Sequence, residues 1–215
     1  MNNTQSDIIS DIHNYCIDFK SREIFLHNYF GSADSENPGV EYKMSNIFIK
    51  NLRLLELKNH DPIIIHMHSI GGSWSDGMAI YDCINISNSY ITIIAYGQTE
   101  SMSSIILQAA DCRMLSRNSY FMVHYGSTVI AGDYHSTQNW ANYEKNLCES
   151  MLNIYSGRCI KGKFFKEKYT KPDIVKTKNF LSKKLKDGDW YINAEDAVYY
   201  GFADKVVDNW ADLTN

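Results

Sequence analysis

Two short stretches of the chain each deliver one reactive side chain at the end of an apolar, strand-like run. Ser101 follows the run at residues 90–96 and opens a helix-like segment over residues 101–110, so unpaired backbone N–H groups are expected around it. His124 ends a second strand-like run, 23 positions later. A histidine can act as the base that activates a serine hydroxyl, so the pair indicates acyl transfer.

Each of these residues also has an ordinary structural explanation. Serine is favoured at helix N-caps, and a lone histidine at the end of an apolar strand is more often structural than reactive. The glycine-rich turns nearby favour the reactive interpretation, because α/β proteins gather their sites at such strand ends. The backbone N–H groups of Met102 and of Gly71-Gly72 are predicted to bind the developing oxyanion, since glycine lets a substrate approach closely.

The alternation of strand-like and helix-like segments predicts a largely parallel α/β arrangement. Predicted strands cover residues 22–27, 63–68, 90–96, 112–115, 120–124 and 203–207, and predicted helices cover 73–86, 101–110 and 137–156. Residues 43–58 read as a strand or a helix pair, and residues 31–38 as a turn-rich loop. The helix over 73–86 is expected to be well buried, because its apolar residues lie on several sides.

The longest predicted helix, residues 137–156, carries an aromatic-rich apolar stripe. Its members are Trp140, Tyr143, Leu147, Met151, Ile154 and Tyr155. Such a stripe is most often buried within its own domain. Its aromatic character and near-heptad spacing support the alternative of a subunit interface.

Composition bounds the class of protein. A length of 215 residues with 44% apolar residues suits one globular domain with a substantial core. There is no run of eighteen apolar residues and no export-signal pattern at the N-terminus, so no membrane span is expected. Five cysteines without a CxxC spacing indicate reduced thiols in a cytoplasmic protein.

The net charge of the chain is −4, but the charges are unevenly distributed and one segment is strongly basic. Residues 161–188 contain ten lysines and three acidic residues, a net charge of +7. The segment lacks an arginine cluster and has few aromatics, so it is interpreted as a solvated, partly helical insertion and not as a nucleic-acid site. His66 and His68 share one face of a strand, but no third ligand stands at a diagnostic spacing, and no metal site is predicted.

Four motifs in order resemble the proteolytic subunit of the Clp protease, ClpP. Residues 69–82 resemble the family's S-P-G-G-x-x-x-x-G-M-x-I-Y-D segment, and residues 97–102 its nucleophile motif G-Q-A-A-S-M. Residues 120–124 are similar to R-V-M-I-H, and residues 189–204 to D-R-F-L-S-A-x-E-A-x-x-Y-G-L-V-D. The likeness extends weakly from about residue 8 to residue 207.

The resemblance implies a fold and a set of roles. The fold would be the ClpP/crotonase-type spiral of strand-strand-helix units, one domain over residues 1–215. It would comprise an N-terminal segment (1–21), a projecting handle strand and helix (125–160) and the insertion (161–188). Ser101 would be the nucleophile, His124 the base and Asp189 the residue that orients it, with Asp187 as the alternative carboxylate. Gly72 and Met102 would form the oxyanion hole.

The resemblance also implies substrates and partners. Gly71 and the segment Gly126, Ser127 and Thr128 would contact an extended substrate. The protein would be an ATP-dependent-type serine endopeptidase that cleaves unfolded proteins or small peptides. It would form a homo-oligomeric tetradecamer of two stacked heptameric rings, joined through the aromatic stripe and served by an ATP-driven unfoldase. No metal or organic cofactor would be needed.

Departures from the family pattern keep alternatives open. Ile70 replaces the family's proline, Tyr125-Gly126 replaces Gln-Pro, and Glu100, expected to point to solvent, replaces alanine. The alternatives are a crotonase-fold enzyme acting on acyl-CoA thioesters, a catalytically weak structural subunit of a mixed ring, and a self-contained processing protease of the kind that matures viral shells. None of the departures removes Ser101, His124 or Asp189.

Overall fold

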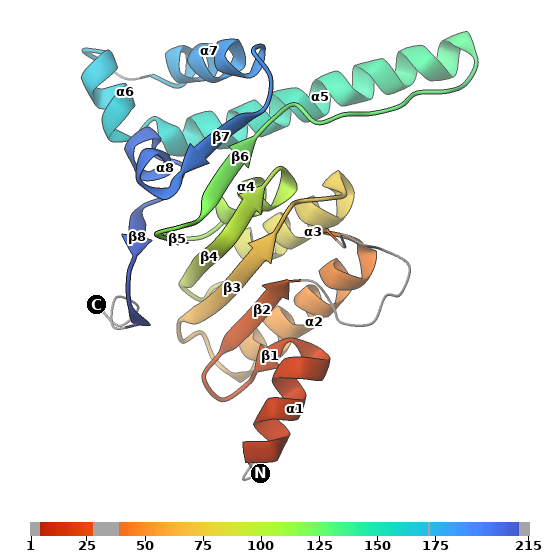
Figure 1. The fold of residues 1–215 in the computed structure, drawn as a ribbon. Coiled ribbons are helices and arrows are strands. Elements are labelled where there is room, and N and C mark those ends of the chain that lie inside the picture. Colours follow the sequence, from red (N-terminus) through yellow and green to blue (C-terminus); the bar gives the residue numbers. More distant parts are fainter. Residues whose placement is uncertain (1–4, 28–38, 172, 211–215) are drawn as a thin grey trace.

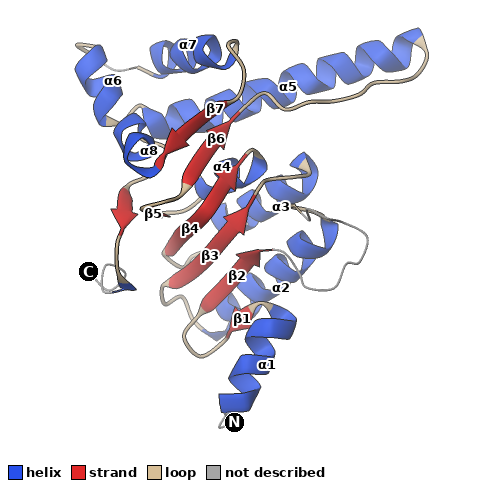
Figure 2. Ribbon diagram, in the orientation of Figure 1, coloured by secondary structure: helices blue, strands red, loops and turns tan. Residues whose placement is uncertain are grey.

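A mostly parallel sheet carries helices that pack around it in the part of the chain that the computed structural model describes, residues 5–27, 39–171 and 173–210 (Figures 1 and 2). The strands are β1 (Ile17–Asp18), β2 (Glu23–His27), β3 (Ile63–Ser69), β4 (Ile91–Glu100), β5 (Cys112–Ser116), β6 (Tyr120–Val123), β7 (Trp190–Asn193) and β8 (Lys205–Val207). The helices are α1 (Gln5–Tyr15), α2 (Tyr42–Lys58), α3 (Trp74–Asn85), α4 (Met102–Leu107), α5 (Tyr134–Cys159), α6 (Lys163–Lys168), α7 (Ile174–Leu185) and α8 (Ala194–Tyr200).

The strand order confirms the predicted α/β class. Along the sheet the strands lie in the order β1-β2-β3-β4-β5-β8, while β6 pairs with β4 and with β7. The pairs β1–β2 and β6–β7 are antiparallel, and the other pairs are parallel. Helices α2, α3 and α4 pack side by side against the sheet, as Figure 1 shows. This is the arrangement that repeated strand–helix units produce.

Strand β4 bends so that one edge serves two partners. Its first half, residues 92–95, pairs with β5, whereas residues 98–100 pair with β6. Between them Gly97 has a φ of 55°, and the register with β3 slips, because Met67 faces Ala95 while Ser69 faces Thr99. An irregularity of this kind re-aims the end of a strand. The bend therefore carries the end of β4 beyond β5 and alongside β6.

Local sequence explains where several helices begin. The side chain of Glu41 accepts hydrogen bonds from two backbone N–H groups at the start of α2, and Asp133 does the same for α5. Ser73 accepts from the backbone N–H of Asp76 at the start of α3. These side chains satisfy donors that have no partner inside the helix, so they define the starts of the helices.

Some predicted elements differ from those observed. Residues 43–58, ambiguous in the sequence, form the single helix α2. The N-terminal segment contains α1, and residues 190–200 form β7 and α8, none of which local periodicity predicted. The helix predicted over 73–86 is only partly buried, with Gly77, Ile80 and Ile84 inside. The turn-rich loop expected at residues 31–38 lies outside the described residues.

The apolar stripe of α5 divides into two environments. Met151 and Tyr155, near the C-terminal end, are buried in the core. Trp140 and Tyr143, three turns earlier, remain 51% and 43% exposed. Figure 1 shows the reason, since the N-terminal half of α5 projects past the sheet. The interpretation as a domain core is confirmed for the C-terminal end of α5, whereas a subunit interface at the exposed end stays a prediction.

The lysine-rich residues 161–188 are partly helical, as predicted, and form α6 and α7, whose inner sides pack against the rest of the fold. Helix α7 packs along α5, and Leu181 and Leu185 are buried on its inner side. Phe164 of α6 and Phe180 of α7 pack against Tyr200 of α8 at ring-centroid distances of 4.7 and 6.3 Å. The Lys168 ammonium lies 5.4 Å from the ring centroids of both Phe164 and Phe180, so this cluster also carries a cation at its surface.

Two expectations drawn from composition can be compared with the described residues. All five cysteines are free thiols, as the sequence predicted. Among the helices of residues 5–27, 39–171 and 173–210, none has both the length and the apolar character that crossing a bilayer requires.

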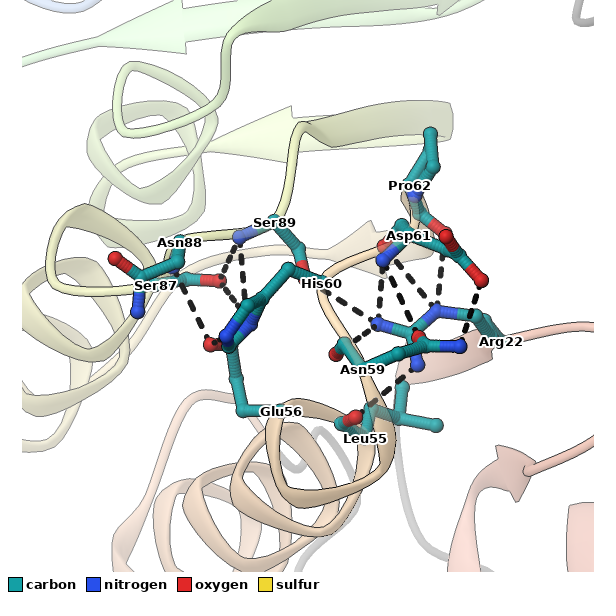
Figure 3. Close-up of polar contacts among 10 residues, drawn as sticks. All are labelled: Arg22, Leu55, Glu56, Asn59, His60, Asp61, Pro62, Ser87, Asn88 and Ser89. Atoms are coloured by element: carbon teal, nitrogen blue, oxygen red, sulfur yellow. Dashed lines mark hydrogen bonds and ion pairs between the residues drawn. The ribbon is translucent and has the colours of Figure 1, made fainter.

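Polar contacts connect the turns that precede β2, β3 and β4 (Figure 3). The Arg22 guanidinium donates to the carbonyl oxygens of Leu55 and Asp61, at 3.1 and 2.9 Å. Beside it, the Glu56 carboxylate accepts hydrogen bonds from the Ser87 hydroxyl at 2.6 Å and the Ser89 backbone N–H at 3.1 Å. Burial tends to raise the pKa of Glu56, but these hydrogen bonds outweigh it and hold that pKa at about 2.

We predict that Glu56→Gln lowers the free energy of unfolding at pH 7 by about 1–2 kcal/mol, because charge-assisted hydrogen bonds are lost. A lowered pKa stabilises the fold above the unfolded-state value of 4.5, and this contribution disappears as the pH falls toward about 2. Urea unfolding of both proteins between pH 7 and pH 2.5 measures the difference. Glu195→Gln, at an exposed ion pair with Arg117, is the control and should change little. A pH-independent difference would contradict the prediction.

Candidate active site

Ser101 lies in a strained turn between β4 and α4. Its φ of 52° and ψ of −123° are unusual for a residue with a side chain, and Ser101 is one of three non-glycine residues with positive φ among the described residues. Its backbone N–H donates to the Met122 carbonyl oxygen at 3.0 Å, and the Ser104 hydroxyl donates to the Ser101 carbonyl oxygen at 2.6 Å. The Ser101 side chain makes no N-cap hydrogen bond, so the turn presents the hydroxyl away from its own helix.

The hydroxyl of Ser101 instead contacts His124. The distance from His124 Nε2 to Ser101 Oγ is 2.8 Å, a hydrogen bond. Parallel pairing of β4 with β6 explains this contact, because Glu100 faces Met122 and both strands end at the same edge. The sequence predicted the two residues as a pair, and the structure brings them together.

Asp189 lies at the other side of the imidazole. Its Oδ1 is 3.4 Å from His124 Nδ1, within ion-pair range. The antiparallel register of β6 and β7 pairs Val123 with Trp190, and therefore places Asp189 opposite His124. Asp187, the alternative carboxylate, has its backbone N–H bonded to the Lys184 carbonyl oxygen in the turn after α7. Of the two carboxylates, Asp189 is the one beside the imidazole.

Gly71 and Gly72 make the turn that faces Ser101. Gly71 has a φ of 93°, and a Cβ there would lie 2.6 Å from the Cβ of Ser101. Gly72 has a φ of 148°, and a Cβ there would lie 2.3 Å from the Val40 carbonyl oxygen. Only glycine fits both positions, so the backbone passes directly against the serine. Gly72 and Met102 both line the cleft that contains Ser101, where N–H donors for an oxyanion are needed.

A cleft of about 200 Å³ opens beside Ser101 and His124. The predicted substrate segment Gly126, Ser127 and Thr128 lines it, although these residues form no strand in the described chain. Sequence reasoning did not assign six further lining residues to the cleft: Trp74, Ile105, Glu144, Leu147, Cys148 and Met151. The spacing of residues 144, 147, 148 and 151 on one helix face was the available signal, since residues three and four apart are neighbours.

The insertion supports this cleft from outside. The hydroxyl of Tyr125, next to His124, lies 3.1 Å from Ser182 Oγ on α7. Lys178 of α7 pairs with Glu149 of α5 and donates to Asn153 at 2.8 Å. Helix α7 thus touches the residue after His124 and leads directly to Asp189. Tyr125, one of the departures from the family pattern, is therefore in contact with the insertion.

Three other residues considered in the sequence lie outside this cleft. The Glu100 carboxylate accepts an exposed contact from Gln98 at 3.4 Å and does not line the cleft. His66 is buried between Tyr96, at 2.8 Å, and Glu23, at 3.2 Å, on the sheet, whereas His68 is exposed. Among the described residues no group of three or more His, Cys, Asp or Glu side chains is arranged to hold a metal ion.

Comparison with known proteins identifies similar chains. The model of the Clp protease family matches residues 35–210. The ATP-dependent Clp protease proteolytic subunit of Deinococcus radiodurans is 29% identical over 172 residues, which cover 79% of this chain and 76% of that protein. The subunit of Carsonella ruddii is 25% identical over 209 residues, with 95% and 92% covered. Proteolytic subunit 2 of Pseudomonas aeruginosa is 26% identical over 178 residues, with 82% and 81% covered.

We predict that Asp189→Asn slows the reaction of Ser101 with a fluorophosphonate by about 100-fold or more. An asparagine cannot stabilise the imidazolium and favours the wrong imidazole tautomer. Inactivation rates measured by mass spectrometry test this. Asp187→Asn, two positions away and not beside His124, should react at the wild-type rate. Equal slowing in both variants would contradict the assignment of Asp189.

Proposed function

Because the chain belongs to the Clp protease family, we propose that it is a serine endopeptidase that cleaves unfolded polypeptides or small peptides through an acyl-enzyme. The single observation that carries this proposal is the 2.8 Å contact between His124 Nε2 and Ser101 Oγ in a strained turn. Such strain is maintained only where the surrounding structure supports it, and it collects at reactive sites. A serine that served only as a cap would have turned its hydroxyl toward its helix.

The proposed reaction follows from these positions. His124 Nε2 takes the proton of Ser101 as Oγ attacks the peptide carbonyl carbon, and the carbonyl oxygen becomes an oxyanion. Backbone N–H groups of Gly72 and Met102 stabilise that charge. His124 then gives the proton to the leaving amine, and water releases the acyl group by the same steps in reverse order. Asp189 holds Nδ1–H and stabilises the imidazolium, and we expect its 3.4 Å separation from His124 to shorten when substrate binds.

The substrate segment and the partners belong to the same proposal. Residues 126–128 border the cleft, and main-chain pairing with an extended peptide there would tolerate many sequences. The curated relatives are named as ATP-dependent proteolytic subunits. We therefore propose an ATP-driven unfoldase as partner, a homo-oligomer of stacked heptameric rings joined through the exposed end of α5, and a cytoplasmic location.

The alternative functions have less support. A crotonase-type acyl-CoA enzyme does not need a hydroxyl paired with an imidazole, and such a pair is present. A structural subunit without activity needs no carboxylate beside that imidazole, and Asp189 is there. A self-contained processing protease would share the triad, and activity in the absence of an unfoldase would distinguish it.

We predict that Ser101→Ala abolishes cleavage of a fluorogenic peptide, by about 10⁵-fold or more, because the nucleophile is removed. Wild-type protein should gain the mass of one fluorophosphonate adduct per chain, on the peptide containing Ser101. Ser150→Ala, which alters an exposed serine on α5, is the matched control and should retain both properties. Unchanged turnover in Ser101→Ala, or an adduct on another serine, would contradict the proposal.

We predict that replacing both Trp140 and Tyr143 by alanine reduces the mass of the native particle. These side chains pack edge to face at 5.6 Å and expose apolar surface at the projecting end of α5, as interface residues do. Light scattering measures the mass, with the pair Ile86→Ala and Tyr90→Ala, also exposed, as the control. An unchanged mass with a lower melting temperature would instead assign the stripe to the core of the domain.

A further inference from the structure

The cleft beside Ser101 contains a carboxylate whose role the catalytic residues leave unexplained. This inference rests on the proposed peptidase function and concerns the side chain that the cleft accepts. The cleft volume of about 200 Å³ corresponds to the room of roughly six water molecules, enough for one long side chain. Its apolar walls consist of Trp74, Met102, Ile105, Leu147 and Met151. Among the described residues that line it, Glu144 is the one carboxylate.

Helix α5 directs Glu144 into this cleft. Residues 144, 147, 148 and 151 stand at positions i, i+3, i+4 and i+7, and all four line the cleft. Met151 is buried in the core, and Glu144 lies seven residues earlier, about 10 Å along the helix axis. The cleft therefore has an apolar wall beside the core and a carboxylate toward the projecting half of α5.

Glu144 is partly buried and has no cation beside it within the described chain. No hydrogen bond or ion pair of its carboxylate occurs there, and Lys178, the lysine that reaches α5, pairs with Glu149 and Asn153 instead. Lys145 follows Glu144 directly, and neighbours in sequence do not share a helix face. The charge of Glu144 acts inside the cleft, since burial raises the pKa of the Cys148 thiol and Glu144 raises it further.

We propose that this cleft is the subsite for the residue preceding the scissile bond (P1) and that Glu144 makes it select lysine or arginine. The aliphatic stem of either residue packs along the apolar walls, while its cationic end reaches the carboxylate. A partly buried carboxylate attracts a basic P1 side chain and repels an acidic one. Glu144 would therefore favour basic P1 residues and also disfavour acidic ones. Apolar side chains of equal length fill the same walls but leave Glu144 without a partner.

The test compares three fluorogenic tripeptide coumarins that differ only at P1: lysine, norleucine and glutamate. Norleucine has the stem of lysine without its charge. We expect kcat/KM for lysine to exceed that for norleucine about tenfold, and glutamate to be the poorest substrate. The ratio of lysine to norleucine should fall as sodium chloride rises from 20 to 500 mM, since the site is partly exposed.

Substitutions at Glu144 test whether this residue causes the preference for lysine at P1. Glu144→Gln should reduce the lysine-to-norleucine ratio about tenfold, and Glu144→Lys should make glutamate a better substrate than lysine. Glu149→Gln removes the same charge from the same helix outside the cleft and should keep the wild-type ratio. Far-ultraviolet circular dichroism checks folding. If the Glu144 variants do not fold, the inactivation of wild-type protein by P1-lysine and P1-norleucine phosphonates at several salt concentrations decides the question.

Distinct results would overturn the inference. Equal or higher activity on norleucine in the wild type, or a lysine preference that Glu144→Gln leaves intact, would reject it while the peptidase function stands. A change in particle mass in Glu144→Gln with an unchanged ratio would assign Glu144 to a contact between copies, and would also reject it. If no substrate is cleaved and fluorophosphonate leaves Ser101 unlabelled, the proposed function fails, and this inference fails with it.

Discussion

The divided edge of β4 is the constraint on which the site depends. An ordinary strand offers one edge to one neighbour, but β4 pairs first with β5 and then with β6, on either side of Gly97. Because of this bend, β6 ends beside Ser101 and not beside the middle of the sheet. Strand β7 then adds to β6 in the antiparallel sense and brings Asp189 to the imidazole. Three side chains that are distant in sequence thus meet through two strand registers.

Contacts on both sides of the turn stabilise the strained backbone conformation of Ser101. The Ser103 hydroxyl lies 2.7 Å from both the Ser69 and the Glu100 carbonyl oxygens, and so ties the turn to β3. The Ser104 hydroxyl lies 2.6 Å from the buried Tyr155 hydroxyl and links the turn to α5. A positive φ at a residue with a side chain costs of order 1–3 kcal/mol, which several such hydrogen bonds can offset. The core around Tyr155 is therefore part of what holds the nucleophile in place.

Sequence reasoning predicted the features that depend on local pattern or on short motifs. The strand ends at Ser101 and His124 could be predicted, because each follows an apolar run and glycine-rich turns stand nearby. The position of Asp189 depended on the resemblance, since the pairing of β7 with β6 leaves no trace in local periodicity. Residues 43–58 were ambiguous because α2 alternates apolar and polar residues irregularly. The spacing of residues 144, 147 and 151 could have placed Glu144 on one helix face with apolar neighbours, but only the fold shows that this face of α5 borders the serine.

Helix α5 has three structural roles along its length, although its sequence shows a single apolar stripe. Its C-terminal end completes the core through Tyr155, its middle forms a wall of the cleft through Leu147 and Met151, and its N-terminal half projects with Trp140 and Tyr143 exposed. Glu144 lies next to Tyr143, where the cleft meets the projecting half. Under the proposed assembly, a contact that covers the exposed aromatics would act on the same helix that forms the wall beside Ser101. Assembly and substrate selection would then depend on the same element.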